Sequence, residues 1–184
     1  NPRIIRWGEN VLEREPDDPQ VLERVIVALL QKGDPASAER ALKYNHRFTK
    51  LLAEASLQRP DGEQASSGKE TAKLKDGADR GRARALILEA RAEGLLGHKE
   101  KAIAAAQSSY VAYPSVEGAR EASRWLAESA QDQDAIEYLA KAFSLAELTA
   151  TDPAAAPLRV RLGELYRKPT GSAVGLGYLP RQVY

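Results

Sequence analysis

A short pattern of small residues and helix breakers occurs three times in this sequence of 184 residues, and it limits the fold more than any other feature. In each copy a glycine or alanine comes first, an alanine follows five residues later, and an alanine or leucine follows four residues after that. The copies are Gly33, Ala38 and Leu42; Gly97, Ala102 and Ala106, with Pro114 after them; and Ala130, Ala135 and Leu139. Ala102 and Ala135 are 33 residues apart, and Ala38 lies 64 residues before Ala102, close to twice that spacing.

The spacing of this pattern predicts pairs of closely packed antiparallel helices. Two helices approach closely only where their facing residues are small, and an apolar residue one turn later fills the next gap. A glycine is suited to end the first helix, and a proline stops the second because it cannot continue the hydrogen-bond ladder. One such pair cannot bury its own apolar face, so copies are expected to stack. Aromatic residues make up only 6% of the chain, which also favours helices over a sheet, and we predict an all-α fold.

These features resemble the tetratricopeptide repeat, a two-helix unit of about 34 residues. The best copy of its L-G-x2-Y element consists of Leu162, Gly163 and Tyr166. The resemblance implies an all-α protein, an α-solenoid of stacked antiparallel helix hairpins wound into a right-handed superhelix. It divides the single domain of residues 1–184 into a half unit at 1–16, units at about 19–52, 83–114 and 116–147, and a degenerate unit at 156–184. No unit has the signature tryptophan, and the alternative is a helical bundle without repeats.

Residues 59–81 interrupt the repeats. They contain several glycines, one proline and dispersed charges, and Leu74 is their only large apolar residue. A segment of this composition cannot offset the entropy lost when its backbone is ordered. We therefore expect a polar loop insertion over 59–81, with one short polar helix near residues 70–75. The loop is either a tolerated surface insertion or a segment that binds a partner.

No group of residues in the sequence points to catalysis or to a cofactor. His46 and His98 lie in different units, and neither has a second histidine or a carboxylate at the helical spacing of a zinc pair. Paired carboxylates such as Asp17 and Asp18 flank helix starts, where they are expected to accept backbone hydrogen bonds. We expect no catalytic residue, no bound metal and no cofactor.

The charge balance limits the partners. The chain has 27 basic and 26 acidic side chains and a formal charge of +1, so no field of the whole molecule would attract nucleic acid or an anionic membrane. No apolar run approaches the roughly 20 residues that span a bilayer. We expect a soluble protein, with the cytoplasm slightly favoured, and neither nucleic acid nor membrane as a partner. Any electrostatic site must be local.

One set of arginines is a candidate binding face. In the repeat family the first helix of each unit lines the concave surface, so polar residues of those helices are candidates for a ligand site. The candidate peptide-binding residues are Arg84, Ile87 and Arg91 in one unit, and Arg120 and Arg124, beside Glu117, in the next. Guanidinium groups grouped in this way can bind carboxylates. The alternative is a solvated face on which the arginines pair with Glu93, Glu121 and Glu128.

The resemblance implies a non-catalytic protein–protein interaction module, a scaffold that binds a peptide or protein segment in its concave groove. Acidic peptides would match the arginine face. The alternative is a helical accessory domain of a larger enzyme, for example one fused to a thioredoxin-like or hydrolase domain outside residues 1–184. The half unit at the start and the glycine-rich end of the sequence motivate that alternative.

Overall fold

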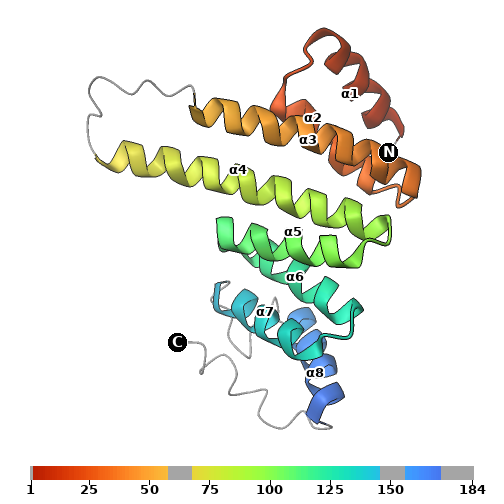
Figure 1. The fold of residues 1–184 in the computed structure, drawn as a ribbon, viewed down its shortest axis with the longest axis vertical. Coiled ribbons are helices and arrows are strands. Elements are labelled where there is room, and N and C mark those ends of the chain that lie inside the picture. Colours follow the sequence, from red (N-terminus) through yellow and green to blue (C-terminus); the bar gives the residue numbers. More distant parts are fainter. Residues whose placement is uncertain (1, 58–67, 146–155, 171–184) are drawn as a thin grey trace.

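The computed structural model describes the chain over residues 2–57, 68–145 and 156–170, and the regular structure in these ranges is α-helical (Figure 1). The helices are α1 (Pro2–Arg14), α2 (Pro19–Leu30), α3 (Pro35–Leu57), α4 (Gly68–Leu95), α5 (Lys99–Ala112), α6 (Val116–Glu128), α7 (Asp132–Leu145) and α8 (Ala156–Thr170). The predicted all-α class is confirmed for the described part of the chain. None of these helices is both long enough and apolar enough to cross a membrane.

Polar side chains mark where two of the helices begin. Asp18 precedes α2, and its carboxylate accepts hydrogen bonds from the backbone N–H groups of Gln20 and Val21, at 2.8 and 3.0 Å. Ser115 precedes α6, and its hydroxyl accepts a hydrogen bond from the N–H of Gly118 at 3.1 Å. These bonds satisfy donors that the first turn of a helix leaves without a partner. The capping role predicted for Asp18 is confirmed.

The first position of each repeated copy has a left-handed backbone conformation. Gly33 and Gly97 have φ angles of 73° and 82°, and Ala130 has a φ of 60°. Such a residue ends a helix and turns the chain into the next one, and glycine adopts this conformation without a steric cost. The same turn therefore joins α2 to α3, α4 to α5 and α6 to α7. The three copies correspond in structure as they do in sequence, although alanine replaces glycine in the third.

Each helix packs mainly on its neighbours in sequence, so the chain forms antiparallel helix pairs that stack into a solenoid (Figure 1). The first helix α4 also contacts the first helices α2 and α6 of the adjacent pairs. Among the described helices the backbones of α3 and α5, and of α5 and α7, do not approach one another to the same extent, although the Tyr110 and Tyr138 rings join α5 to α7. Elements on the inner side of a curved stack lie closer together than those on the outer side. We therefore place α2, α4 and α6 on the concave side, and call their exposed surface the first-helix face.

Two kinds of core hold the stack together. Between α1, α2, α3 and α4 the core consists mainly of large aliphatic side chains, and Leu22 and Leu29 are completely buried. Between α4, α5 and α6 the core consists mainly of alanines, such as Ala102 and Ala106, packed around the ring of Trp125. We call the first region the aliphatic core and the second the alanine seam.

The predicted loop over residues 59–81 is wrong from residue 68 onward, because α4 begins at Gly68 and continues through the rest of that range. Within these residues the sequence predicts a helix only near 70–75, and that part is helical. The composition of the segment does not indicate a long helix, but packing on the neighbouring α3 supports one. A Cβ atom on Gly81 would lie 3.2 Å from Cδ2 of Leu52 in α3, so the glycine allows the two long helices to approach closely. This packing outweighs the roughly 1 kcal/mol by which a glycine disfavours a helix.

Two predictions lie outside the described residues. They are the remaining part of the polar loop, residues 59–67, and the second helix of the degenerate last unit, within residues 171–184. The division of the chain into repeat units stays a prediction.

Candidate functional site

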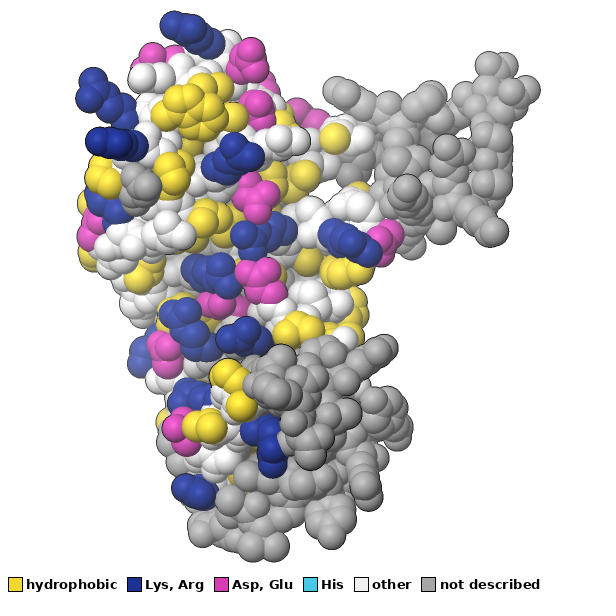
Figure 2. Space-filling view, turned by 180° about the vertical axis from the view of Figure 1, so that it is seen from behind, with side chains coloured by type: hydrophobic (Ala, Val, Ile, Leu, Met, Phe, Trp, Pro, Cys, Tyr) yellow, Lys and Arg dark blue, Asp and Glu magenta, His cyan; other side chains and the backbone are white. Residues whose placement is uncertain are grey.

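Charged side chains form a band on the first-helix face. Figure 2 shows this side of the molecule, where Lys and Arg side chains alternate with Asp and Glu side chains across the middle of the view. The band arises because α4 and α6 carry charged residues at spacings of three, four or seven, which place them on one side of the helix, and α2 adds Glu23 and Arg24.

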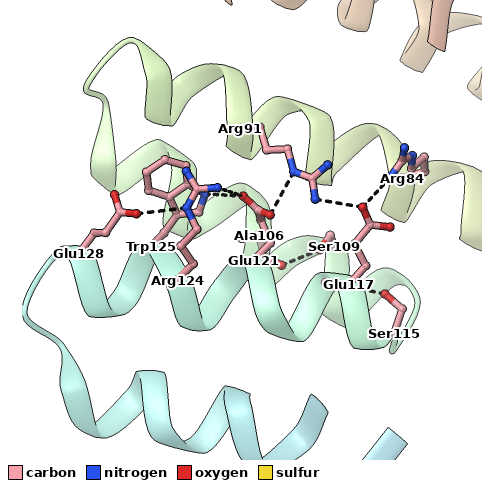
Figure 3. A network of polar contacts seen from close by, with 11 residues as sticks. Arg84, Arg91, Ala106, Ser109, Ser115, Glu117, Glu121, Arg124, Trp125 and Glu128 are labelled. Atoms are coloured by element: carbon pink, nitrogen blue, oxygen red, sulfur yellow. Dashed lines mark hydrogen bonds and ion pairs between the residues drawn. The ribbon is translucent and has the colours of Figure 1, made fainter. Parts of the chain in front are cut away.

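A continuous series of ion pairs links the three first helices, and Figure 3 shows its part between α4 and α6. Arg84 of α4 donates from Nε to Glu23 of α2 at 2.7 Å, and from Nη1 to Glu117 of α6 at 2.6 Å. Arg91, two turns along α4, donates from Nη2 to the same Glu117 oxygen and from Nε to Glu121, both at 3.0 Å. We call this series the charge ladder. It fixes α2, α4 and α6 relative to one another at their exposed edges.

Glu121 is the buried end of the charge ladder, with 7% of its side chain exposed. Besides Arg91, it accepts hydrogen bonds from Nη1 of Arg124 at 3.3 Å and from the indole Nε1 of Trp125 at 3.1 Å. A buried carboxylate is costly unless charged and hydrogen-bonding groups satisfy it, and these three donors do so. Arg124 also stacks over the Trp125 ring, 4.1 Å from its centroid, and donates to Glu128 at 3.1 Å. Arg124 is therefore held against its own helix.

The surroundings of Arg84 keep it charged. Burial lowers the pKa of this guanidinium, but the hydrogen bond to Glu23 and the negative charge of Glu117 outweigh burial, so the pKa is raised above its ordinary value. Two carboxylates already balance the charge of Arg84. It acts as a link between helices.

A hollow of about 720 Å³ opens beside the charge ladder, between α4, α6, α7 and α8. Its lining includes Arg91 from α4, Val116, Glu117, Arg120, Glu121 and Arg124 from α6, Leu139 from α7, and Pro157 and Arg161 from α8. We call it the charged hollow. Four arginines and two glutamates line it, so the lining has an excess of positive charge although the whole chain is almost neutral.

Arg120 is the most available cation in the charged hollow. Its side chain is exposed, and it forms no ion pair or hydrogen bond with any residue in the described ranges. Arg161 is also exposed and pairs with Glu164 on its own helix at 3.3 Å, a surface contact worth less than about 1 kcal/mol. Both guanidinium groups can bind an outside carboxylate without breaking the charge ladder.

The structure places the five predicted binding residues in three environments. Arg84 and Arg91 belong to the charge ladder and Arg124 adjoins it, whereas Arg120 projects into the charged hollow. Ile87 is 3% exposed, so it contributes no surface for a ligand. Ile87 shares a helix side with the arginines, but α2 and α6 flank α4 there. Long arginine side chains can reach solvent from such a position, and a short apolar one cannot.

The alternative of arginines paired with glutamates holds in part. Glu121 and Glu128 pair with arginines, as that interpretation expects. Glu93 does not, because its carboxylate lies 2.6 Å from Nδ1 of His98, at the turn between α4 and α5. Glu23 and Arg161, which the sequence did not single out, complete the ladder and the hollow. Glu23 and Arg161 lie on other helix pairs than the predicted arginines, so the spacing of residues within one repeat unit does not indicate that they belong to the site.

The described residues contain no group of three or more His, Cys, Asp and Glu side chains that could hold a metal ion. His98 is engaged by Glu93, and His46 is exposed on α3. The arrangement on the first-helix face is instead a fixed set of charges beside an open cationic hollow.

Comparison with solved structures gives a likeness in fold. No protein-family model and no curated protein matches this sequence. A thermophilic TPR protein from Thermus thermophilus is similar in structure, with 17% sequence identity over 88% of each chain and a TM-score of 0.43. TPR is the abbreviation of tetratricopeptide repeat.

Proposed function

We propose that this chain is a non-catalytic protein-binding module, and that it holds an acidic segment of a partner protein in the charged hollow of its first-helix face. The observation that carries the proposal is Arg120, an exposed cation with no partner among the described residues, in a hollow where arginines outnumber glutamates. A cation in this position can form a strong contact with a carboxylate that the chain itself does not supply.

The charged hollow has the groups that such a segment needs. Arg120 and Arg161 can each bind a carboxylate through two parallel N–H groups, which fixes the direction of the contact. Val116 and Pro157 offer apolar surface beside them, and this surface can cover the aliphatic part of a bound side chain. The hollow therefore suits a peptide with acidic residues better than it suits a small ion.

The charge ladder has a separate role in this proposal. It holds Arg91 and Arg124 at the border of the hollow, so the binding surface exists before the partner arrives. Side chains that are already fixed lose little conformational entropy on binding. Arg84 contributes by joining α2 to α6, and Ile87 contributes to the core.

Selection from a displayed library of random peptides about 12 residues long tests this proposal directly, because an extended peptide of that length is long enough to follow several helices. Peptides retained by the purified chain are synthesised with a fluorescent label, and their affinity is measured by anisotropy. We expect Arg120→Glu to weaken binding at least tenfold, about 1.4 kcal/mol. Added salt should weaken the unmodified complex, because an open hollow is only partly shielded from solvent ions.

The matched control is Lys43→Glu, which makes the same change of charge at an exposed position of α3, outside the hollow. Thermal melting of both variants shows whether they are folded. Equal affinities of the two variants for the selected peptides would exclude the charged hollow as the site.

A further inference from the structure

A second hollow lies on the other side of the charge ladder. It has a volume of about 740 Å³ and opens between α1 and α2. Ile4 and Trp7 of α1 and Val27 of α2 supply apolar surface. We call it the apolar hollow. The charged hollow is dominated by arginines, whereas this one combines the exposed apolar side chains of α1 with polar side chains of α2, namely Gln20, Glu23, Arg24 and Gln31.

Trp7 and Ile4 are exposed to an unusual degree for side chains of their kind. They are 51% and 39% exposed, and they lie three residues apart, on one side of α1. An exposed tryptophan leaves a large apolar area in water, and this residue type is enriched at the centres of binding interfaces. Trp7 also borders a smaller hollow of about 340 Å³ on α1, so a ligand can approach its ring from more than one direction.

The position of Trp7 is fixed by its neighbour in the sequence. A Cβ atom on Gly8 would lie 2.2 Å from Cγ2 of Val25, so α1 sits directly on α2 at this point. Ile5 and Leu12 of α1 are buried in the aliphatic core. The opposite side of α1, which carries Trp7, is therefore presented to solvent by a firmly packed helix.

One charge in the apolar hollow remains unbalanced. Glu23 lines it but is already paired with Arg84 at 2.7 Å. Arg24, the next residue, is exposed and has no ion pair or hydrogen bond within the described part of the chain. A ligand that complements this hollow has a large apolar side chain next to a carboxylate.

The charge ladder connects the two hollows. Glu23 lines the apolar hollow and contacts Arg84, which contacts Glu117 in the lining of the charged hollow. Neighbouring helix axes are about 8–10 Å apart, so α2 and α6, separated by α4, are about 16–20 Å apart. An extended peptide of about six residues spans that distance. One segment can thus reach both hollows along the first-helix face.

We propose that the apolar hollow is an anchor pocket for the partner segment. It receives one large apolar side chain, such as that of Leu, Met or Phe, against Trp7 and Ile4, and Arg24 binds a carboxylate beside it. The segment then continues across α4 and places its acidic residues at Arg120 and Arg161. This inference rests on the proposed function and adds the position and chemistry of a second contact.

The peptide selection also tests this inference. We expect the selected peptides to have one large apolar residue with an acidic residue beside it, and a second acidic group at least about six residues away. Trp7→Ala should weaken their binding at least tenfold, and Arg24→Glu should weaken it several-fold. Replacing the apolar residue of the peptide by alanine should cost at least tenfold with the unmodified chain and almost nothing with Trp7→Ala. The control Val111→Ala removes an apolar side chain that is 79% exposed on α5, and it should leave the affinity unchanged.

Fluorescence gives an independent readout. Binding should shift the Trp7 emission to shorter wavelength and protect it from a soluble quencher, whereas Trp125, which is 3% exposed, supplies a constant background. The shift should disappear in Trp7→Phe.

Each other outcome has a definite meaning. Loss of binding in Arg120→Glu but not in Trp7→Ala or Arg24→Glu overturns the anchor pocket and leaves the proposed function standing. Loss in Trp7→Ala and Arg24→Glu but not in Arg120→Glu supports the pocket and overturns the charged hollow. Sedimentation that shows a dimer dissociated by Trp7→Ala means that a second copy covers the apolar hollow, which overturns the pocket. Failure to select any peptide overturns both proposals.

Discussion

The aliphatic core and the alanine seam fill the space between neighbouring helices in opposite ways. Between α1 and α4, side chains such as Leu22, Ile26 and Leu29 fill the space between helices, and all three are completely buried. Between α4, α5 and α6, the helices approach until alanines such as Ala102 and Ala106 are enough to fill the space. The volume of large buried side chains stabilises the aliphatic core, and the close approach of the helices stabilises the alanine seam.

The difference shows which region shapes the binding face. In the alanine seam α4 and α6 lie close enough for Arg91 to reach Glu117 and Glu121 across the surface. The same closeness is visible at Gly94 of α4, where a Cβ atom would lie 1.9 Å from the ring of Trp125 in α6. The aliphatic core buries large apolar side chains, and the alanine seam sets the spacing on which the charge ladder depends.

The largest effect is expected from removing volume in the aliphatic core. Ile26→Ala deletes a completely buried side chain and should destabilise the protein by about 2–5 kcal/mol, because transfer energy is lost and a cavity remains. Chemical denaturation measures this change. Val111→Ala, at an exposed position, should alter stability by less than about 0.5 kcal/mol. Similar losses in both variants would mean that Ile26 does not lie in a closely packed core.

The next largest effect is expected from adding volume to the alanine seam. Ala102 has no exposed surface, and Ala102→Leu should cost about 1–3 kcal/mol because the helices must move apart. The movement should also loosen the charge ladder and weaken binding of selected peptides. The matched control is Ala104→Leu, at an exposed position of the same helix, which should be nearly neutral. Equal tolerance of leucine at both positions would contradict the close packing of the seam.

The sequence predicted the parts of this fold that depend on local spacing. Ala38, Ala102 and Ala135 all have no exposed surface, as the repeated pattern requires. The turn at Ala130 has the left-handed conformation that Gly33 and Gly97 adopt at the equivalent positions. In both cases the constraint comes from a few neighbouring residues, which is why it can be read without a structure.

The start of α4 could not be predicted in the same way. Glycines and charges over residues 68–81 indicate a loop when they are considered alone, yet the segment is helical. Its helical state depends in part on Leu52 of α3, which packs beside Gly81. A long-range contact of this kind leaves no mark in the composition of either segment.

The candidate site shows the same limit. Arg120 and Arg124 were identified from their position on one helix side, but Arg161 and Trp7 belong to other helix pairs and carry no local signal. Ile87 was included because it shares a stripe with Arg84, and only the helices on either side of α4 account for its burial. Spacing within a helix predicts which residues share a side, and the tertiary packing decides which of them remain exposed.

The smallest effect is expected at Glu89, on the part of α4 that lies between the two regions. Its carboxyl has a raised pKa, chiefly because burial disfavours the charged form and also because the charge of Glu93 repels it. His46 and Lys101 act in the opposite direction. In the unfolded chain the group has its ordinary pKa of 4.5, so the folded state binds the proton more tightly. The ionised carboxylate therefore costs stability above the raised pKa, and this cost disappears as the pH falls through the raised pKa towards 4.5.

Glu89→Gln should remove this cost at neutral pH. Like charges four residues apart on a helix destabilise it by about 0.2–0.5 kcal/mol, so the melting temperature should rise by about 1–2 °C. The gain should shrink at a pH near 4.5, where the carboxyl of the folded unmodified protein is protonated to a greater extent than that of the unfolded chain. Glu39→Gln, at an exposed position of α3, is the control and should show no comparable dependence on pH. A gain that is the same at both pH values would show that the amide acts through packing and that the charge of Glu89 is tolerated without cost. In that event water reaches Glu89, at the boundary between the aliphatic core and the alanine seam. The complete burial of its neighbours Leu88 and Ala90 does not indicate such access.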